Sequence, residues 1–298
     1  MNNFHTPVLL KEVIGFLQVK KGKKYIDATL GGSGHTGEIL SSGGRVLGID
    51  VDQEALDYVK NTQELWIKNQ ELILAKGNFR NLDNIARLNK FDKVSGILFD
   101  FGVSSFQIES GKRGFSFSKG GPLDMRMDKD LSVTARDLIN ILPKGELYEI
   151  FTKLGEEHNA RAISNSIVGA RRINPIETTG DLSGIIQQAY GIKGEVTDFT
   201  RAKLNKRVFQ ALRIAVNDEL DSIKEALPKS LELLESGGRM AVISFHSLED
   251  RIVKQSFAGF EKDDMGRIIT KKPICPDLEE QNSNPRSRSA KLRVFERK

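Results

Sequence analysis

The stretch Tyr25-Ile-Asp-Ala-Thr-Leu-Gly-Gly-Ser-Gly-His-Thr-Gly-Glu-Ile-Leu40 decides the fold of this 298-residue chain. It begins apolar, reaches a carboxylate at Asp27, turns through three glycines and then has the composition of a helix start. A strand, a glycine turn and a helix in this order let backbone amides approach a ligand and point a helix N-terminus at it. The pattern Gly32-x-Gly34-x-x-Gly37 matches the dinucleotide fingerprint, although short glycine patterns also serve ordinary turns.

The acidic residue in this stretch favours a cationic ligand over a dinucleotide. A pyrophosphate group binds at a helix N-terminus without a negative charge nearby, whereas Asp27 places a carboxylate directly before the glycines. S-adenosylmethionine carries an ammonium group and a sulfonium and has no phosphate. The order of apolar strand, aspartate, short spacer and glycine-rich turn is similar to the first motif of class I methyltransferases, which use this cofactor.

The composition predicts a globular protein of the cytoplasm without a membrane span. Hydrophobic residues make up 39% and charged residues 29% of the chain. No apolar run approaches the length of about 20 residues that crosses a bilayer, and the stretch 1–7 lacks the basic start of a signal peptide. The single cysteine, Cys275, excludes an internal disulfide and a cysteine-cluster metal site. A net charge of +5 permits a nucleic-acid partner without requiring one.

Apolar runs that alternate with helical patterns predict a parallel, doubly wound α/β sheet. A short amphipathic helix is expected over 5–20, with His5 in a capping or solvent-facing role or beside a site. Strands are expected at 24–28, 45–52, 71–79, 93–100, 239–246 and 292–295, and helices between the first four strands at 35–42, 53–68 and 81–90.

Polar or aromatic residues follow the first four predicted strands, namely Asp27, Asp50, Phe79 and Asp100. Ligands of open parallel sheets bind outside the carboxyl ends of the strands, so these side chains predict a site at that edge. Asp50 stands 19 residues after Gly31, where a carboxylate can bind ribose hydroxyls; an ordinary solvent-facing acid is the alternative. Phe79 is a candidate for stacking on an adenine, and a core role is its alternative.

A helical domain is expected to interrupt the sheet after the fourth strand. Glycine-rich loops follow Gly102, and helical patterns at 132–170 and 178–190 come next, without any strand signal. The sequence therefore predicts a discontinuous sheet domain, 1–105 plus 206–298, and an inserted, mostly helical domain, 106–205.

A basic run lies where the chain is expected to return to the sheet domain. Residues 200–213 hold five basic side chains and no acid, and the candidates for phosphate contacts are Arg201, Lys203, Lys206 and Arg207. A solvated helix face is an equally good interpretation of such a run. It enters a long helical segment, 205–234, which Pro228 is expected to kink or divide.

Seven motifs stand in order along the chain: His5-Thr-Pro-Val-Leu-Leu10, Asp27-Ala-Thr-Leu-Gly-Gly-Ser-Gly-His35, Asp100-Phe-Gly-Val-Ser-Ser105, Arg113-Gly-Phe-Ser-Phe117, Gly121-Pro-Leu-Asp-Met-Arg-Met-Asp128, Ser244-Phe-His-Ser-Leu-Glu-Asp-Arg251 and Asn284-Pro-Arg-Ser-Arg-Ser289. Together they closely resemble the RsmH (MraW) family of bacterial methyltransferases of small-subunit ribosomal RNA. The resemblance covers essentially the whole chain.

The resemblance implies a class I (Rossmann-like) methyltransferase sheet with an inserted helical domain. It implies methyl transfer from S-adenosylmethionine, with S-adenosylhomocysteine as product, to the exocyclic N4 of a cytidine in the 16S rRNA decoding centre near the P site. The partner is then 16S rRNA, expected within the small ribosomal subunit, and a homodimer is possible. The chemistry needs no metal, and no metal is expected.

The family's cofactor positions carry over onto Ser33, Gly34, His35, Asp50, Phe79, Asp100 and Gln107. The chain departs from the family at two places. Ser33 stands where the family often has glycine, and serine adopts most loop conformations. Phe106 stands where the family often has proline, which puts the shape of the loop before Gln107 in doubt.

Three further roles are open at the level of sequence. Asp100 either accepts hydrogen bonds from the target amino group or holds the amino-acid end of the cofactor. His246 either contacts the target base or takes up a proton, or it only holds the loop after the fifth strand. Arg113, Phe115 and Phe117 are candidates to receive the target base once it leaves its stack, and loop packing is the alternative.

Two other classes of function compete with this interpretation. The literal glycine pattern permits a nicotinamide-dependent oxidoreductase, but Asp27 opposes it and no hydride-transfer constellation is evident. A non-catalytic RNA-binding protein that keeps a methyltransferase fold is the second alternative. The acidic and aromatic set at the strand ends argues against it.

Overall fold

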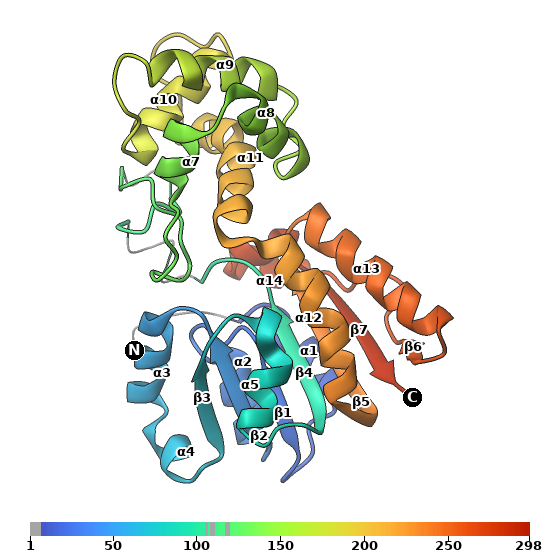
Figure 1. Ribbon diagram of the computed structural model, residues 1–298. Coiled ribbons are helices and arrows are strands. Elements are labelled where there is room, and N and C mark those ends of the chain that lie inside the picture. Colours follow the sequence, from blue (N-terminus) through green and yellow to red (C-terminus); the bar gives the residue numbers. More distant parts are fainter. Residues whose placement is uncertain (1–6, 105–106, 108–110, 117–119) are drawn as a thin grey trace. The chain divides into compact units, whose positions relative to one another are not determined.

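The computed structural model describes residues 7–104, 107, 111–116 and 120–298 of the chain (Figure 1). These residues form two compact units. The sheet unit comprises Met1–Gly102 and Leu220–Lys298, and the inserted unit comprises Val103–Glu219. The inserted unit starts close to the predicted position 106 but extends 14 residues beyond the predicted end at 205.

The sheet unit contains a seven-stranded sheet in the order β3-β2-β1-β4-β5-β7-β6. Neighbouring strands from β3 to β5 are parallel, whereas β7 is antiparallel to both β5 and β6. This is the class I methyltransferase sheet that the sequence predicted. The strands are β1 Lys24–Asp27, β2 Arg45–Asp50, β3 Leu72–Lys76, β4 Val94–Asp100, β5 Leu234–Ser244, β6 Gly266–Ile268 and β7 Lys291–Arg297.

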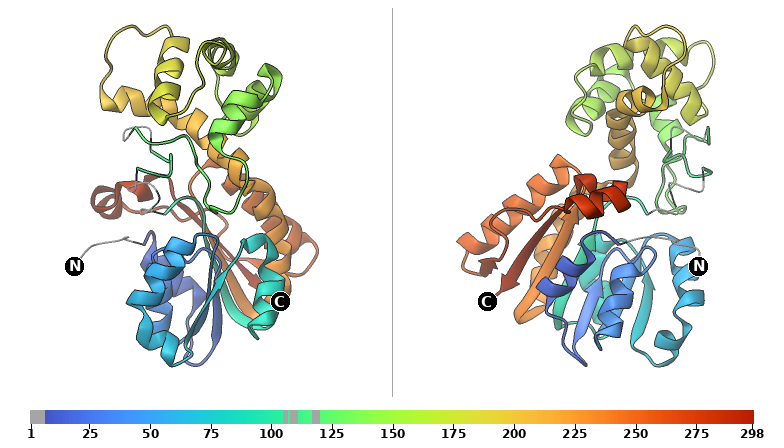
Figure 2. Two further views of the ribbon diagram at one scale, coloured as in Figure 1. Left: turned by 60° about the vertical axis from the view of Figure 1, so that its left-hand side comes forward. Right: turned by 180° about the vertical axis from the view of Figure 1, so that it is seen from behind.

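Both faces of the sheet are apolar, because successive strand residues point to opposite faces and both are covered by helices. Tyr25 and Val46 join one buried cluster, while their neighbours Ile26 and Leu47 join the other. The two faces are seen from opposite sides in Figure 1 and on the right of Figure 2. Helices α1 Leu10–Leu17, α2 Gly34–Ser41, α3 Gln53–Thr62 and α4 Glu64–Lys68 pack on the first cluster; α5 Leu82–Leu88, α12 Glu219–Leu233 and α13 Ser247–Lys262 pack on the second.

The topological switch point of this sheet lies between β1 and β4. The strands before β4 spread to one side of β1, and β4 begins the other half of the sheet. Asp27 at the end of β1 pairs with Leu98, two residues before Asp100 at the end of β4. Ligands of doubly wound sheets bind at such a point, so the fold brings two of the predicted carboxylates to the expected place.

The inserted unit is helical. In the part that the structure describes, its helices are α7 Ala135–Ile141, α8 Lys144–Lys153, α9 Ala160–Ala170, α10 Thr179–Ala189 and α11 Asp198–Asn217. They enclose a separate apolar core that includes Phe151, Ile163 and Leu212. Capping boxes begin α7 and α10: Thr134 and Thr178 each accept from a backbone amide three residues later.

The long segment 205–234 breaks at a place other than the one predicted. Helix α11 ends at Asn217, and the next residue, Asp218, has a left-handed φ of 48° that stops the helical ladder. Pro228 lies inside α12, where the packing of Leu227 and Leu231 in the sheet core holds the turn around it. The predicted end of the insertion at 205 therefore falls inside α11. The buried residues of α11 after position 205, such as Val208 and Leu212, belong to the core of the inserted unit.

Four short elements of the described residues were not predicted: the 3-10 turn η1 Phe79–Asn81, the strand β6, the helix α14 Leu278–Ser283 and the 3-10 turn η2 Pro285–Ser289. Each is six residues or shorter, too brief to show a period in sequence. The predicted helix over 5–20 is present as α1, and His5 lies outside the described residues. None of the helices in the described ranges has the length and hydropathy that a bilayer crossing demands.

Candidate functional site

The glycine turn after β1 is built around two residues with left-handed backbone. Gly31 has φ +49° and Ser33 has φ +62°. Glycine adopts this conformation freely, and Ser33 precedes α2 as its N-terminal flanking residue, 2% exposed. At Gly34 an added Cβ would lie 3.0 Å from the Pro7 ring, so this glycine allows the chain segment before α1 to pass close to the turn.

Asp27 supports the turn from inside. It is 2% exposed, and its Oδ2 accepts from the Thr36 hydroxyl at 2.7 Å while its Oδ1 accepts from the Thr29 amide at 3.2 Å. Burial raises the pKa of Asp27 to about 6, although these hydrogen bonds oppose the shift. Asp27 therefore supplies negative charge to the site at neutral pH without facing solvent.

Asp50, the last residue of β2, ties the turn to the neighbouring strand. Its Oδ2 accepts from the Gly31 amide at 2.8 Å and its Oδ1 from the Asp52 amide at 2.9 Å. Each carboxylate oxygen has two acceptor positions, so Asp50 keeps capacity for further donors such as ribose hydroxyls. Burial raises the pKa of Asp50 to about 6, which leaves it mostly ionised at neutral pH.

Asp100 and His35 meet at the switch point. The His35 Nε2 lies 2.9 Å from the Val8 carbonyl oxygen. A carbonyl only accepts, so Nε2 carries a proton and Nδ1 faces Asp100 Oδ2 at 3.7 Å. Burial, and then the charges of Asp27 and Glu249, raise the pKa of Asp100 well above its usual range. The Asp100 amide donates to the Thr29 hydroxyl at 2.6 Å, which fixes the end of β4 against β1.

One acceptor at the switch point has no donor among the described residues. The Oδ1 atom of Asp100 is buried and accepts no hydrogen bond from this part of the chain. A buried carboxylate oxygen without a donor is costly, and a ligand that brings an ammonium or amino group would satisfy it. Three acids on neighbouring strands, a close-approach glycine turn and this oxygen fit S-adenosylmethionine, and they would repel a pyrophosphate.

Two other predicted cofactor residues occupy different surroundings. Phe79 begins the 3-10 turn η1 Phe79–Asn81, is partly buried, and contacts Phe99 and Phe101 with ring centroids 5.7 and 5.8 Å apart. Its ring thus caps the aromatic core, and stacking on an adenine stays a prediction. Gln107 is 5% exposed in the inserted unit, where its Oε1 accepts from the Ser104 amide at 3.0 Å. Its role toward the cofactor also stays a prediction.

The basic candidates of the run 200–213 lie on α11. Lys203, Lys206 and Arg207 are exposed, and Arg201 is partly exposed. Val208 and Leu212 on the other face of the helix are buried in the inserted core. An amphipathic helix thus presents the three lysine and arginine side chains to solvent, where phosphate contacts are sterically possible.

Arg113 is built into a loop. It is 4% exposed, and its Nη2 donates to the carbonyl oxygens of Arg126 and Met127 at 2.9 and 2.8 Å. These contacts favour the loop-packing alternative over a direct contact with RNA. Phe115 packs against the inserted core, while Phe117 and Phe106 lie outside the described residues.

His246 caps α13. Its Nδ1 accepts from the Glu249 amide at 3.4 Å, and its Nε2 lies 3.1 Å from Glu249 Oε1. Glu249 is fully buried, and its Oε2 accepts from the Phe245 and His246 amides at 2.7 and 3.2 Å. This reciprocal capping box favours the loop-holding role over proton transfer.

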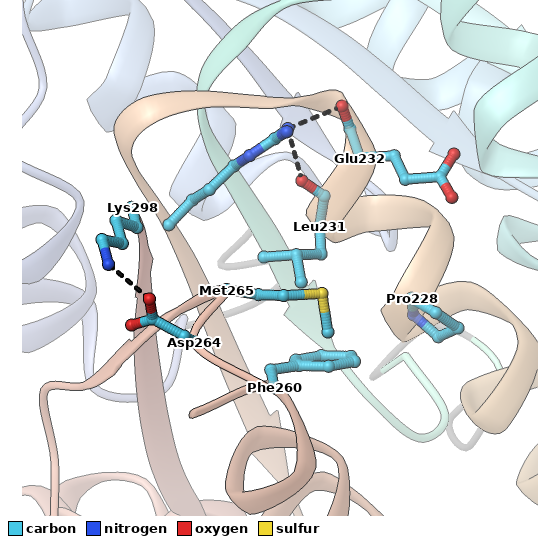
Figure 3. A pocket seen from close by; sticks show the side chains of 8 residues that line it. Pro228, Leu231, Glu232, Phe260, Asp264, Met265 and Lys298 are labelled. Atoms are coloured by element: carbon cyan, nitrogen blue, oxygen red, sulfur yellow. Dashed lines mark hydrogen bonds and ion pairs between the residues drawn. The ribbon is translucent and has the colours of Figure 1, made fainter. Parts of the chain in front are cut away.

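A cavity of about 370 Å³ lies elsewhere in the sheet unit (Figure 3). Its lining includes Leu231, Phe260, Met265 and Arg297, and an ion pair joins Lys298 to Asp264 at its rim. Arg297 follows Glu296, which pairs with Arg239 near the amino ends of the parallel strands. The cavity is therefore at the sheet edge opposite the carboxylates and is separate from the candidate site.

Sequence reasoning missed the residues that support the site from behind. Thr29 and Thr36 bind Asp27 and Asp100, and Pro7 and Val8 contact the turn and His35. Threonines two and nine residues after an aspartate give no distinctive pattern. The positions of Pro7 and Val8 depend on how the chain before α1 folds back over the turn, which spacing alone does not reveal.

Known proteins resemble this chain over its whole length. A family model described as the MraW methylase family matches residues 2–298. The ribosomal RNA small subunit methyltransferase H of Coprothermobacter proteolyticus is 43% identical over 301 residues, covering 100% of this chain and 98% of that protein. The protein of the same name from Clostridium botulinum (strain Loch Maree / Type A3) is 43% identical over 308 residues, covering 97% of both.

Among solved structures, an rRNA methylase from Streptococcus thermophilus covers 98% of both chains at 12% identity, with a TM-score of 0.46. That likeness is too remote to support an argument, and the fold assignment rests on the strand order described above. The family model, by contrast, matches residues 2–298, and the two named relatives are each 43% identical to this chain. On these grounds the chain belongs to the MraW methylase family.

Proposed function

We propose that this protein transfers a methyl group from S-adenosylmethionine to the exocyclic N4 of a cytidine in 16S rRNA, in the decoding centre near the P site. The observation that carries the proposal is the acidic edge at the switch point, where Asp50, Asp100 and the glycine turn come together. Membership of the MraW methylase family supports the ribosomal substrate, because the curated relatives are named for the small-subunit RNA.

Different residues of the sheet unit bind different parts of the methyl donor, S-adenosylmethionine. When bound, S-adenosylmethionine supplies an activated methyl group on a sulfonium. Asp50 accepts hydrogen bonds from ribose hydroxyls, and the turn from Ser33 to His35 lets the donor approach the backbone. Phe79 offers a ring to the adenine. The family resemblance also carries a cofactor-binding role over to Gln107, which belongs to the inserted unit.

Asp100 has two possible duties, and both use its buried oxygen. A cytosine amino nitrogen is a weak nucleophile because its lone pair is delocalised into the ring. A carboxylate that accepts from the amino hydrogens favours a localised lone pair and holds the nitrogen in line with the methyl group. Alternatively, Asp100 Oδ1 accepts from the ammonium group of the cofactor. The family resemblance leans toward the second duty.

The Asp100→Asn variant separates the two duties. If Asp100 holds the cofactor, the variant binds S-adenosylmethionine more weakly by calorimetry and keeps the wild-type turnover number at saturating cofactor. If Asp100 acts on the target amino group, turnover falls while the cofactor dissociation constant changes little. Methylation that the wild type performs and that Asp50 or Asp100 variants lose, without loss of ribosomal RNA binding, would also favour an enzyme over a non-catalytic RNA-binding protein.

The substrate particle and the cellular setting belong to the same proposal. We expect the enzyme to act in the cytoplasm on 16S rRNA within the small ribosomal subunit, without a metal, and a homodimer is possible. Light scattering tests the dimer, and activity in the presence of a chelator tests the absence of a metal requirement.

Methyl transfer from labelled S-adenosylmethionine tests the function itself. Free 16S rRNA, 30S particles and 70S particles are incubated in parallel and digested to nucleosides. Label in N4-methylcytidine supports the proposal, and the preferred particle shows when the enzyme acts. Label in another nucleoside, or none despite measurable cofactor binding, would overturn the substrate while leaving the fold intact.

A further inference from the structure

An exposed aromatic side chain stands at the start of the basic helix. Phe199, in the first turn of α11, is 82% exposed. The other exposed apolar side chains of the inserted unit are aliphatic or are tyrosines with a phenolic hydroxyl, among the residues that the structure describes. A phenylalanine that gains nothing from core packing at this position calls for another explanation.

Phe199 shares a helix face with the exposed lysines. At 100° per residue, Lys203 lies about 40° from Phe199 around the helix axis, Lys206 about 20° to the other side, and Arg207 about 80° away. Val208 and Leu212, both fully buried, lie on the opposite face. Phe199, Lys203, Lys206 and Arg207 are called the α11 stripe below.

The acids near the stripe do not neutralise its lysines. Asp198 precedes Phe199 but lies about 100° away around the axis. Glu195 precedes the helix. Arg207 lies near Tyr190, whose hydroxyl donates to Glu157 at 2.7 Å. Lys203 and Lys206 have no carboxylate within ion-pair distance among the described residues.

We propose that the α11 stripe is a single-stranded RNA contact in which Phe199 stacks on an unpaired base and Lys203 and Lys206 contact the phosphates that flank it. This inference rests on the proposed function, since it assigns a surface to the same ribosomal RNA. Aromatic rings beside cations are the shared device of proteins that bind single strands, because every base offers a face and every linkage a charge.

The charge of the stripe decides between RNA and other occupants. A second copy of this chain would have to bring acids to three cations around an apolar ring, and a lipid surface would require more apolar side chains than one. A nucleic acid matches the spacing, since Lys203 lies about one helical turn after the ring and Lys206 and Arg207 lie about two turns after it. RNA is therefore the occupant that we infer.

Phe199→Ala provides the first test. It removes the ring without touching the charges, and it lowers affinity for a fluorescent 16S-derived single-stranded oligonucleotide by about five- to a hundredfold. Tyr148→Ala is the matched control: Tyr148 is exposed on α8 of the same unit, next to Glu149. A change below about twofold at Phe199, or an equal change at Tyr148, would overturn the inference.

Salt dependence separates the ring from the lysines. Each phosphate contact by a cation contributes about 0.7 to the slope of log affinity against log salt for single strands. The double variant Lys203→Gln/Lys206→Gln should lower the steepness of this slope by about 1.4. Phe199→Ala should leave the slope unchanged and lower the affinity by the same factor at every salt concentration. A slope change in Phe199→Ala, or none in the lysine pair, contradicts the assigned roles.

A fluorescence measurement reports stacking directly. Trp66 is the sole tryptophan, in α4 of the sheet unit. In a Trp66→Phe background, Phe199→Trp places the only indole on the stripe, and a stacked base should quench its emission on RNA addition. Unchanged emission under saturating RNA would show that no base stacks there. A loss of self-association with unchanged RNA affinity in Phe199→Ala would instead assign the face to a second copy.

Failure of this inference differs from failure of the proposed function. If the wild-type protein methylates 30S particles and the Phe199→Ala variant has an unchanged KM for them, the RNA contact at the α11 stripe is wrong. The proposed methyltransferase function then still stands. For a supporting result, KM for the RNA substrate rises with the loss of oligonucleotide affinity while kcat stays within about twofold. Wild-type protein without methyl transfer would overturn the function before the stripe is tested.

Discussion

The sheet unit and the inserted unit place charge in opposite ways. In the sheet unit, Asp27, Asp50 and Asp100 gather at the ends of neighbouring strands, buried or partly buried and with raised pKa values. In the inserted unit, α11 buries its apolar face and exposes lysines and arginine. Buried acids suit a small cation, whereas exposed bases suit a large polyanion. Each unit thus has the electrostatics of one of the two substrates.

The largest expected effect comes from opening the core of the inserted unit. Phe151 is fully buried there, and Phe151→Ala should cost about 3–5 kcal/mol of stability by removing a packed ring. If the acidic edge alone provides most cofactor affinity, S-adenosylmethionine binding falls by less than about tenfold. Urea unfolding and calorimetry measure the two quantities, and Tyr148→Ala on the same helix is the control. Loss of cofactor binding in a variant whose sheet unit stays folded would break the comparison.

The second largest effect is a loss of cofactor affinity when Asp50, at the carboxyl edge of the sheet, is replaced. Asp50→Ala removes the acceptor for ribose hydroxyls and leaves the Gly31 and Asp52 amides without their carboxylate. Hydrogen bonds to a charged group are worth about 1.5–3 kcal/mol, so the cofactor dissociation constant should rise about 10- to 100-fold. Affinity for the RNA oligonucleotide should stay within about twofold. Asp57→Asn, an exposed acid on α3, should leave both affinities unchanged.

The pH dependence sharpens the comparison further. The folded-state pKa of Asp27 and of Asp50 is about 6, above the ordinary value of 3.8. For an acid shifted upward, the favourable contribution to folding is fully present below about pH 4 and is lost as pH rises through 6. Cofactor binding needs ionised Asp50 and follows the opposite trend.

Between pH 7 and pH 5 the dissociation constant of S-adenosylmethionine should therefore rise about tenfold, while the cofactor-free protein gains stability from these two groups. Calorimetry and thermal unfolding across this range measure both. Asp50→Asn should flatten the pH dependence of binding. Affinity that is constant from pH 7 to pH 5 in the wild type would show that Asp50 does not have to be ionised.

The smallest effect concerns His246. His246→Ala removes the cap of α13 and should lower the free energy of unfolding by about 0.5–2 kcal/mol. Methyl transfer should stay within about threefold of wild type at every pH. His246→Asn should recover the stability, since asparagine also caps helices but cannot carry a proton at neutral pH. A turnover that falls steeply in both variants, with a changed pH profile, would restore the proton-transfer role.

The sequence predicted the carboxyl edge of the sheet well. Short apolar runs ended at Asp27, Asp50 and Asp100, and these are the last residues of β1, β2 and β4. The prediction succeeded because a parallel strand buried on both faces leaves an uninterrupted apolar run, and because all such strands end on one side. The first polar residue after each run then falls at the ligand edge.

What the sequence left open depends on contacts between distant segments. The buried carboxylate of Asp27 accepts from Thr36 on α2, and the break of the long helix follows from the left-handed backbone at Asp218. Aspartate at 218 is compatible with a helix interior in sequence, whereas Pro228 looks like a breaker. The exposure of Phe199 was equally invisible, since it is set by which face of α11 the inserted core covers.

The antiparallel strand β7 has a consequence for biosynthesis. β7 fills the position between β5 and β6, so β6 has no sheet neighbour until residues 291–297 have been translated. The inserted unit, by contrast, is one continuous stretch of chain and depends on no later residues for its own core. During translation the helical unit can thus mature first, while the edge of the sheet stays open to misassociation. Completing the sheet therefore requires β7 to pair with two strands that precede it in the chain.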